Sequence, residues 1–395
     1  MDGAAAEDVR ADDSGTEQHV QPEGDQARRP RRGVAALVGA VALAGIVAAG
    51  AVGLGSAPPE PAAERARTPP VPVAAVLPTG LPVAPGSTLP GVLAVPVAPA
   101  PAPSPGSVGA LARARPVPPT RHTACPPPRC SDVSVPLPAG VRVPDNRVRV
   151  LLPRGYAGTT RRYPVVYLLH GRGGTYEEWT TRSDLTAYTA GTPAIFVMPD
   201  GGRNATAGWY SDWEDGTFQV ETFHVDVLMP WVASHYRTLP GRNAVMGLSM
   251  GGLGALTYAA HHPGAFRVAA SFSGVVDSRY AAPATRLLSG HMARVWGDRV
   301  ADAGVWAAHD PTALAPALVG TTVLLASGTG DAAAPPARPG GQERALYSQH
   351  PALLAALDRS GVVHRDHFYA GGTHSWPYWT ADLHWALPQV LAALR

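Results

Sequence analysis

One short motif in this 395-residue chain has the residue types for nucleophilic chemistry. Residues 247–251 read Gly-Leu-Ser-Met-Gly, between an apolar run that ends at Met246 and a stretch with helical spacing. A serine at such a strand–turn–helix junction is typical of a nucleophile elbow, in which small flanking residues let neighbouring backbone pass close to a strained turn. Its hydroxyl would stand at the amino end of a helix, where developing negative charge is stabilised. We therefore interpret Ser249 as a nucleophile.

A serine hydroxyl needs a general base to react. The candidate is His374, in the loop Ala-Gly-Gly-Thr-His that follows the last predicted strand, 365–369. The remaining histidines near predicted elements lie at a helix end, on or beside that strand, or in the last helix: His261, His262, His364, His367 and His384. We predict that His374 is the base.

The residues leave the acid that orients this base open. Asp331 follows the predicted strand 321–326 within Ser-Gly-Thr-Gly-Asp, a common place for such a carboxylate. Glu343 opens the next helical region, and Asp277 follows the preceding strand. Their structural alternatives are a turn-forming Asp331 and a Glu343 that only interacts with the helix dipole.

Two backbone N–H groups are needed to stabilise an oxyanion. One belongs to Met250, the residue after the nucleophile. For the other we predict Arg172, within the Gly-rich run 168–174 after an early strand.

Aromatic side chains near these motifs are candidates for lining a site beside Ser249: Trp209, Tyr210, Trp213, Trp376 and Trp379. We predict a substrate-binding role for Tyr210, Trp213 and Trp376, the last lying two residues after the base. The chain has no zinc-binding His-Glu-x-x-His and no phosphate-binding Gly-Lys-Ser/Thr motif, and no dinucleotide-binding glycine pattern follows the first strand. We expect no metal and no cofactor.

Short apolar runs alternate with helical patterns from residue 130 onward. Runs 163–169, 194–198, 244–246, 267–272 and 321–326 read as buried strands, and 221–236, 251–261, 341–357 and 379–394 read as helices. This alternation predicts an α/β class domain with a mostly parallel central sheet and helices on both faces.

The amino-terminal part has a different composition. Residues 1–33 read as a disordered tail, and 34–55 form an uncharged apolar run, long enough to cross a bilayer at about 1.5 Å per residue. The basic stretch 28–32 precedes this run, so the positive-inside bias places the tail in the cytoplasm and the remainder outside. We predict a transmembrane anchor, with a cleaved signal segment as the alternative.

A linker is predicted at 56–121, because 18 of the 42 prolines and no aromatic residue fall between Ala57 and Thr120. The catalytic domain is then 122–395. Its two cysteines, Cys125 and Cys130, are expected to form a disulfide in an oxidising compartment. Lys and Arg number 32 against 30 acidic residues, without a basic cluster in this domain, so nucleic acid is not an expected partner.

Several blocks together resemble the secreted mycolyltransferases, within the wider esterase D-like family of serine esterases. They are Val197-Met-Pro-Asp-Gly-Gly, Tyr210-Ser-Asp-Trp, Glu221-Thr-Phe, Gly247-Leu-Ser-Met and Gly372-Thr-His-Ser-Trp-Pro-Tyr-Trp. The resemblance implies an α/β-hydrolase fold. It also implies a triad glutamate eighteen residues before a glycine, a spacing that Glu343 and Gly361 reproduce, so it favours Glu343 over Asp331.

The chain departs from that family after the early strand. The mycolyltransferases carry Asp-Gly-Leu-Arg, whose Asp and Arg hold trehalose, where this chain has His170-Gly-Arg-Gly173. Trehalose and mycolate specificity are therefore not implied.

We expect an extracytoplasmic serine esterase or acyltransferase that acts through an acyl-serine on a carboxylic ester. A lipid or sugar ester of the cell envelope is the candidate substrate, and the membrane is a partner through the N-terminal helix. The alternative is an inactive hydrolase-fold domain for cell-wall binding or adhesion. The sequence leaves the acyl chain, the acceptor and the oligomeric state open.

Overall fold

The computed structural model describes residues 111–113, 116–117, 125–279, 291–335 and 337–395. Within them, eight strands form one sheet in the order β1-β2-β4-β3-β5-β6-β7-β8. β2 pairs antiparallel with β1 and β4, and the other neighbouring pairs are parallel. The strands are β1 Cys130–Ser134, β2 Arg147–Leu151, β3 Tyr163–Leu169, β4 Ile195–Pro199, β5 Thr238–Leu248, β6 Val268–Phe272, β7 Thr322–Gly328 and β8 His364–Tyr369. The predicted mostly parallel sheet is confirmed.

The inner strands of the sheet are buried on both faces, which explains why β3, β4, β6 and β7 are apolar runs rather than alternating ones. In β3, Val165, Tyr167 and Leu169 belong to one hydrophobic core. Val166 and Leu168, between them, belong to the other. Successive side chains of a strand point to opposite faces, so each run supplies two cores at once.

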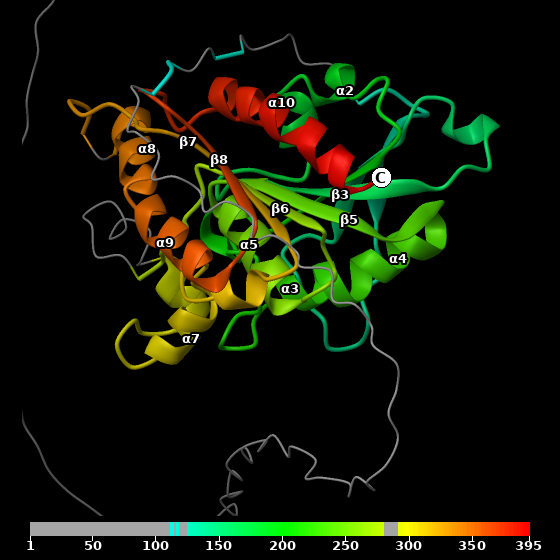
Figure 1. The fold of residues 1–395 in the computed structure, drawn as a ribbon. Helices are drawn as coiled ribbons and strands as arrows, with labels where there is room; N and C mark the ends of the chain where they lie inside the picture. Colours follow the sequence, from blue (N-terminus) through cyan, green and yellow to red (C-terminus); the bar gives the residue numbers. More distant parts are fainter. Residues whose placement is uncertain (1–110, 114–115, 118–124, 280–290, 336) are drawn as a thin grey trace, which may run out of the picture. The chain divides into compact units, whose positions relative to one another are not determined.

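Helices cover both faces, as predicted (Figure 1). One core contains residues from helices α4 Met229–His235, α5 Met250–His261, α7 Ala303–Ala308, α8 Pro339–Tyr347 and α9 His350–Ser360. The other contains residues from α1 Glu178–Thr181, α2 Leu185–Tyr188 and α10 Trp376–Ala393. Short 3₁₀ helices occur at η1 Tyr156–Gly158, η2 Asn204–Thr206 and η4 Ala315–Leu318.

The helix predicted over 221–236 is not a uniform α-helix. It consists of α3 Val220–Thr222, a π-helical stretch η3 Phe223–Leu228 and then α4. Pro230 lies in the first turn of α4. Proline has no N–H to donate to the residue four positions earlier and its ring crowds that carbonyl, so the wider turns of η3 precede it.

Part of the predicted linker lies against the domain. The N–H of Ala370 donates to the carbonyl of Ala112, and the N–H of Val117 donates to the carbonyl of Pro377, both at 3.0 Å. The predicted disulfide between Cys125 and Cys130 is present.

The predicted tail and anchor, 1–33 and 34–55, lie outside the described residues. Among the helices of the described part, none combines the length and apolarity needed to cross a bilayer.

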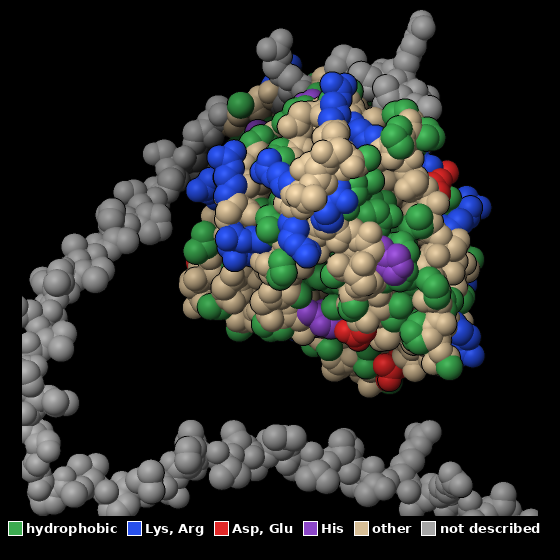
Figure 2. Space-filling view, turned by 90° about the vertical axis from the view of Figure 1, so that its right-hand side faces the viewer, with side chains coloured by type: hydrophobic (Ala, Val, Ile, Leu, Met, Phe, Trp, Pro, Cys, Tyr) green, Lys and Arg blue, Asp and Glu red, His purple; other side chains and the backbone are tan. Residues whose placement is uncertain are grey.

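Arginine side chains gather on one face of the molecule, whereas acidic side chains lie mainly toward its lower and right-hand edges (Figure 2). This face is the right-hand side of Figure 1, where α10 reaches its carboxyl end. α10 has 18 residues and is therefore about 27 Å long at 1.5 Å per residue. Its first residue, Trp376, lines the cavity at Ser249, at the other end of the helix from this face. The arginine-rich face is therefore separate from that cavity.

Candidate active site

Ser249 lies in a strained turn between β5 and α5. Its backbone has φ 54° and ψ −118°, and residues other than glycine rarely adopt a positive φ. A Cβ at Gly247 would come within 2.0 Å of the carbonyl oxygen of Gly251, and one at Gly251 within 2.4 Å of that of Leu169. Both flanking glycines are therefore required by close backbone contact. The Ser249 N–H donates to the carbonyl of Phe272 (2.9 Å), which fixes the turn to the end of β6.

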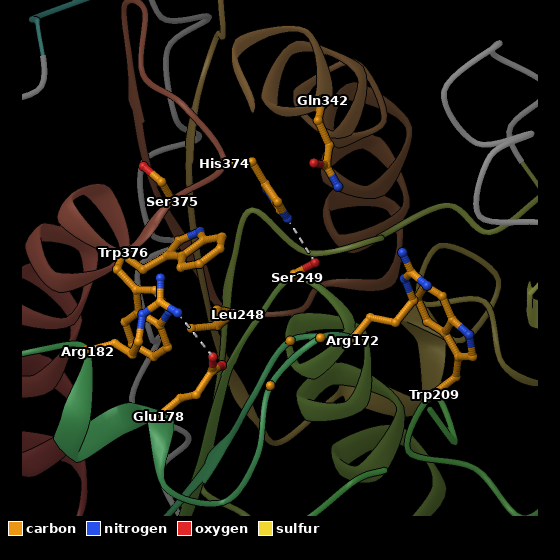
Figure 3. A pocket seen from close by; sticks show the side chains of 14 residues that line it. Arg172, Glu178, Arg182, Trp209, Leu248, Ser249, Gln342, His374, Ser375 and Trp376 are labelled. Carbon is orange, nitrogen blue, oxygen red and sulfur yellow. Dashed lines mark hydrogen bonds and ion pairs between the residues drawn. The ribbon is translucent and has the colours of Figure 1, made fainter. Parts of the chain in front are cut away.

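His374 contacts this serine from the loop after β8. The Ser249 hydroxyl donates to Nε2 of His374 at 2.9 Å (Figure 3). The loop bends through Gly371 and Gly372, whose φ values are 75° and 91°. It is held by a bond from the His374 N–H to the carbonyl of Pro339.

Glu343 completes a row of hydrogen bonds from within the second turn of α8. Nδ1–H of His374 donates to Glu343 Oε2 at 3.1 Å. The other oxygen, Oε1, accepts from Ser273 Oγ (2.7 Å), Ser327 Oγ (3.0 Å) and the Gly328 N–H (2.8 Å). The carboxylate is fully buried. Burial alone raises the pKa of Glu343, but these hydrogen bonds and the electrostatic interaction with His374 outweigh it and hold the pKa below its ordinary value.

The donors to Glu343 were not predicted from the sequence. Ser273 directly follows β6, has φ 46°, and also accepts a bond from Trp379 Nε1 at 3.2 Å. The ring of Trp379 meets that of His374 edge to face at 4.9 Å. The only sequence signal is that Ser273 and Ser327 stand at the carboxyl ends of neighbouring parallel strands.

Asp331, the alternative acid, makes no contact with His374. It is exposed and accepts the N–H of Ala333 at 2.9 Å, so it forms a turn. Asp277 is likewise engaged locally, by the N–H of Arg279.

The two predicted oxyanion donors flank the nucleophile. Gly171 is so close that a Cβ there would lie 3.5 Å from Cβ of Ser249, which brings the adjoining Arg172 backbone beside the serine. The Arg172 N–H lies in a turn and has no backbone acceptor within the described residues. Met250 is the first residue of α5, where a helix has no internal acceptor for the N–H.

A cavity of about 350 Å³ opens at Ser249. Trp376 lines it, as predicted for a substrate-binding residue, and packs edge to face on Trp179. Trp209 and Trp379, two further aromatic candidates from the sequence, also line it. The side chains of Arg172, Glu178, Arg182 and Gln342 line it as well, and the sequence did not predict them for this role. They come from separate segments, so no single motif could reveal them.

The other two aromatic predictions lie elsewhere. Tyr210 is fully buried, and its hydroxyl donates to the carbonyl of His170 at 3.0 Å. Trp213 packs edge to face on Phe218 and is not among the cavity residues. Both support the fold around the site rather than its lining.

Among the residues that the structure describes, no three or more His, Cys, Asp or Glu side chains are arranged to hold a metal ion.

Comparisons with known proteins agree with this geometry. The esterase family model matches residues 144–390. An esterase of Mycobacterium tuberculosis is 48% identical over 140 residues, which are 33% of this chain and only 30% of that protein. The MPT51/MPB51 antigen of the same organism is 30% identical over 256 residues, covering 58% of this chain and 80% of that protein.

An acyltransferase and a solved structure extend the comparison. The diacylglycerol acyltransferase/mycolyltransferase Ag85B of Mycobacterium intracellulare is 29% identical over 256 residues, 58% of this chain and 76% of that one. The crystal structure of Mycobacterium tuberculosis MPT51 superimposes with a TM-score of 0.57 and 26% identity, covering 67% of this chain and 99% of that one.

Proposed function

The chain belongs to the esterase family of α/β-hydrolase-fold proteins, and from that premise we propose that it is a serine ester hydrolase or acyltransferase with the triad Ser249, His374 and Glu343. The observation that carries the proposal is the unbroken row of hydrogen bonds from the serine hydroxyl through the imidazole to the buried carboxylate.

The reaction begins when Ser249 Oγ attacks the carbonyl carbon of the ester and its proton passes to His374 Nε2. The carbonyl oxygen becomes an oxyanion, which the N–H groups of Arg172 and Met250 stabilise. When the tetrahedral intermediate collapses, the bond to the alcohol oxygen breaks and His374 gives its proton to that oxygen. The acyl group is now bound to Ser249.

The second half reverses these steps. A water molecule or an acceptor hydroxyl transfers its proton to His374 Nε2 and attacks the acyl-serine carbonyl. The bond to Ser249 Oγ breaks, and the serine regains its proton from His374. Throughout, Glu343 keeps Nδ1 protonated and stabilises the imidazolium that forms in both halves.

For the substrate we propose an ester with a small acyl group and a polar alcohol, such as a sugar ester. The cavity of about 350 Å³ is at the small end of the roughly 300–1,000 Å³ of small-molecule pockets. Its lining includes charged and amide side chains, Arg172, Glu178 and Gln342. Both features favour a sugar ester of the cell envelope over a long-chain lipid.

We propose that the catalytic domain works outside the cytoplasm, tethered through residues 34–55 or released by cleavage there. The disulfide between Cys125 and Cys130 supports an oxidising compartment. The apolar run 34–55, preceded by basic residues, supports export across a membrane.

Hydrolysis of p-nitrophenyl esters from acetate to palmitate tests the proposal, with Ser249→Ala beside the native protein. We expect turnover that is greatest for short acyl chains and is lost in the variant. Labelling by a fluorophosphonate, which reacts with activated serines, distinguishes the remaining outcomes. Labelling without turnover indicates a transferase that needs its own acceptor, and a folded protein with neither property indicates the inactive binding domain.

A further inference from the structure

One of the two arginines in the catalytic cavity has no counter-charge among the described residues. Glu178 and Arg182 both line the cavity and pair with each other at 3.6 Å. The side chain of Arg172 forms no hydrogen bond or ion pair with any described residue, although it is half-buried. Figure 3 shows it extending from beside Ser249 toward Trp209, on the side of the serine opposite Trp376.

A second arginine and a histidine lie near Arg172. Burial, followed by the charges of Arg172 and Arg294, lowers the pKa of His291, so these three groups are neighbours. Arg294 donates to the carbonyl of Ala205 and is therefore not paired with an acid there. The internal segments 114–115, 118–124 and 280–290 and residue 336 contain no Asp or Glu. Within residues 111–395, therefore, every carboxylate belongs to a described residue, and none of them pairs with Arg172.

Trp209, on the same wall, supplies a second donor without an acceptor. It lines the cavity and is 1% exposed, and its indole Nε1 has no hydrogen-bond partner among the described residues. Its backbone and that of Tyr210 are strained, with φ of 52° and 57°. The ring of Tyr210 packs tightly against Gly254 of α5, where an added Cβ would lie 2.5 Å from the ring. Strained residues that the surrounding structure holds in place are concentrated at ligand sites.

An anion with several acceptor oxygens satisfies an arginine and an indole N–H together, and its hydrogen bonds to the arginine are charge-assisted and therefore stronger than those of a neutral acceptor. We infer that the Arg172 side chain is a specificity determinant, selecting esters that bear an anionic group, a carboxylate or a phosphate, close to the scissile bond. The inference rests on the proposed esterase or acyltransferase function. The anion would bind between Arg172 and Trp209 while the ester carbonyl faces Ser249.

Matched ester pairs test this in the full chain. On the acyl side, monomethyl glutarate is compared with methyl valerate, in which a methyl group replaces the carboxylate. On the alcohol side, 4-acetoxybenzoate is compared with its neutral methyl ester. Release of acid or phenol gives kcat/KM for each, and the ratio of anionic to neutral ester is the readout. Because both members of a pair use the same oxyanion donors, effects on the backbone of residue 172 cancel in this ratio.

We expect one of the two pairs to favour the anion, which also identifies the side of the ester that carries it. Arg172→Gln should lower that ratio by about 10- to 100-fold, the range for losing a hydrogen bond to a charged group. Arg172→Lys should restore part of it. The control is Arg267→Gln, which removes an equal charge before β6, at the opposite end of the strand from Ser249.

A ratio at or below one in both pairs, or a ratio that Arg172→Gln and Arg267→Gln change equally, would refute the inference. Failure of the underlying function looks different. In that case the neutral esters themselves show no turnover that depends on Ser249.

Discussion

Replacing Glu343 by glutamine is the sharpest test of the proposed mechanism. The substitution keeps the size of the side chain, and its amide has one acceptor and one donor end. Oε1 of Glu343 accepts three hydrogen bonds, so the amide oxygen must occupy this position. The amide NH₂ then faces Nδ1 of His374, which can accept only when its own proton has moved to Nε2.

That tautomer cannot accept the proton of Ser249. Loss of the correct tautomer in a serine–histidine–carboxylate triad costs about 10³- to 10⁴-fold in kcat. This corresponds to about 4 to 5.5 kcal/mol of transition-state stabilisation. KM should change much less, because Glu343 is fully buried and does not line the cavity.

The assay is kcat for a p-nitrophenyl ester, with urea unfolding run on each variant. Asp331→Asn is the control, since exposed Asp331 makes only a turn contact and should stay within about twofold of the native rate. Glu343→Ala should also unfold more easily, because it leaves three donors without an acceptor at about 1–3 kcal/mol each. A Glu343→Gln rate within tenfold of native, or a larger loss in Asp331→Asn, would mean that Glu343 is not the triad acid.

Three further outcomes are expected. Ser273→Ala removes one donor to the triad carboxylate, so kcat should fall about 5-fold with KM unchanged; an unchanged kcat excludes a positioning role. His261 and Glu221 are bonded at 2.8 Å, and although burial lowers the pKa of His261, its bonds to Glu221 raise it above the ordinary value. The contribution of this pair to the free energy of unfolding is present in full below the unfolded histidine pKa of about 6.5 and is lost as pH rises through the pKa of His261 in the folded protein. Glu221→Gln should therefore lower the free energy of urea unfolding more at pH 5.5 than at pH 9. A larger loss at pH 9 would contradict this prediction. Replacing Cys125 and Cys130 by serine opens a loop with a sequence separation of only five, so the loss in unfolding free energy should be about 2 kcal/mol, and a loss above 4 would point to a wider structural role.

Much of the fold could be predicted because it is encoded locally. A buried strand flanked by helices on both faces must be a short apolar run, and the run 163–169 coincides with β3 as observed. The predicted and observed elements differ where contacts with another segment, or a single proline, determine the local structure. β5 begins at Thr238, well before the predicted 244, because Thr238 pairs with Tyr163. The intervening stretch 239–243, Leu-Pro-Gly-Arg-Asn, has no apolar run that would have indicated this pairing. The π-helical stretch η3 was not predicted either, since periodicity alone does not show how a chain accommodates Pro230.

At the site, the sequence by itself determined the parts whose chemistry and backbone geometry share one short segment. Ser249 needs glycines at fixed positions around it, and His374 follows the last strand in a Gly-rich loop, so each could be identified from its own neighbours. The residues alone favoured Asp331 as the acid, with Glu343 as a rival and Asp277 as a weaker third candidate. Only tertiary structure turned Glu343 inward toward His374 and left Asp331 in an exposed turn. The resemblance to a known family had favoured the same choice.

Most of the cavity wall was decided by the tertiary structure, although Trp376 could be predicted from its place beside His374. The side chains of Arg172 and Gln342 lie far apart in the sequence, and neither carries a local signal for this role. Parallel strands bring the loops at their carboxyl ends to one edge of the sheet, and there these side chains become neighbours of Ser249. Such a site cannot be identified from the sequence alone, because its residues become neighbours only when the sheet places their segments side by side.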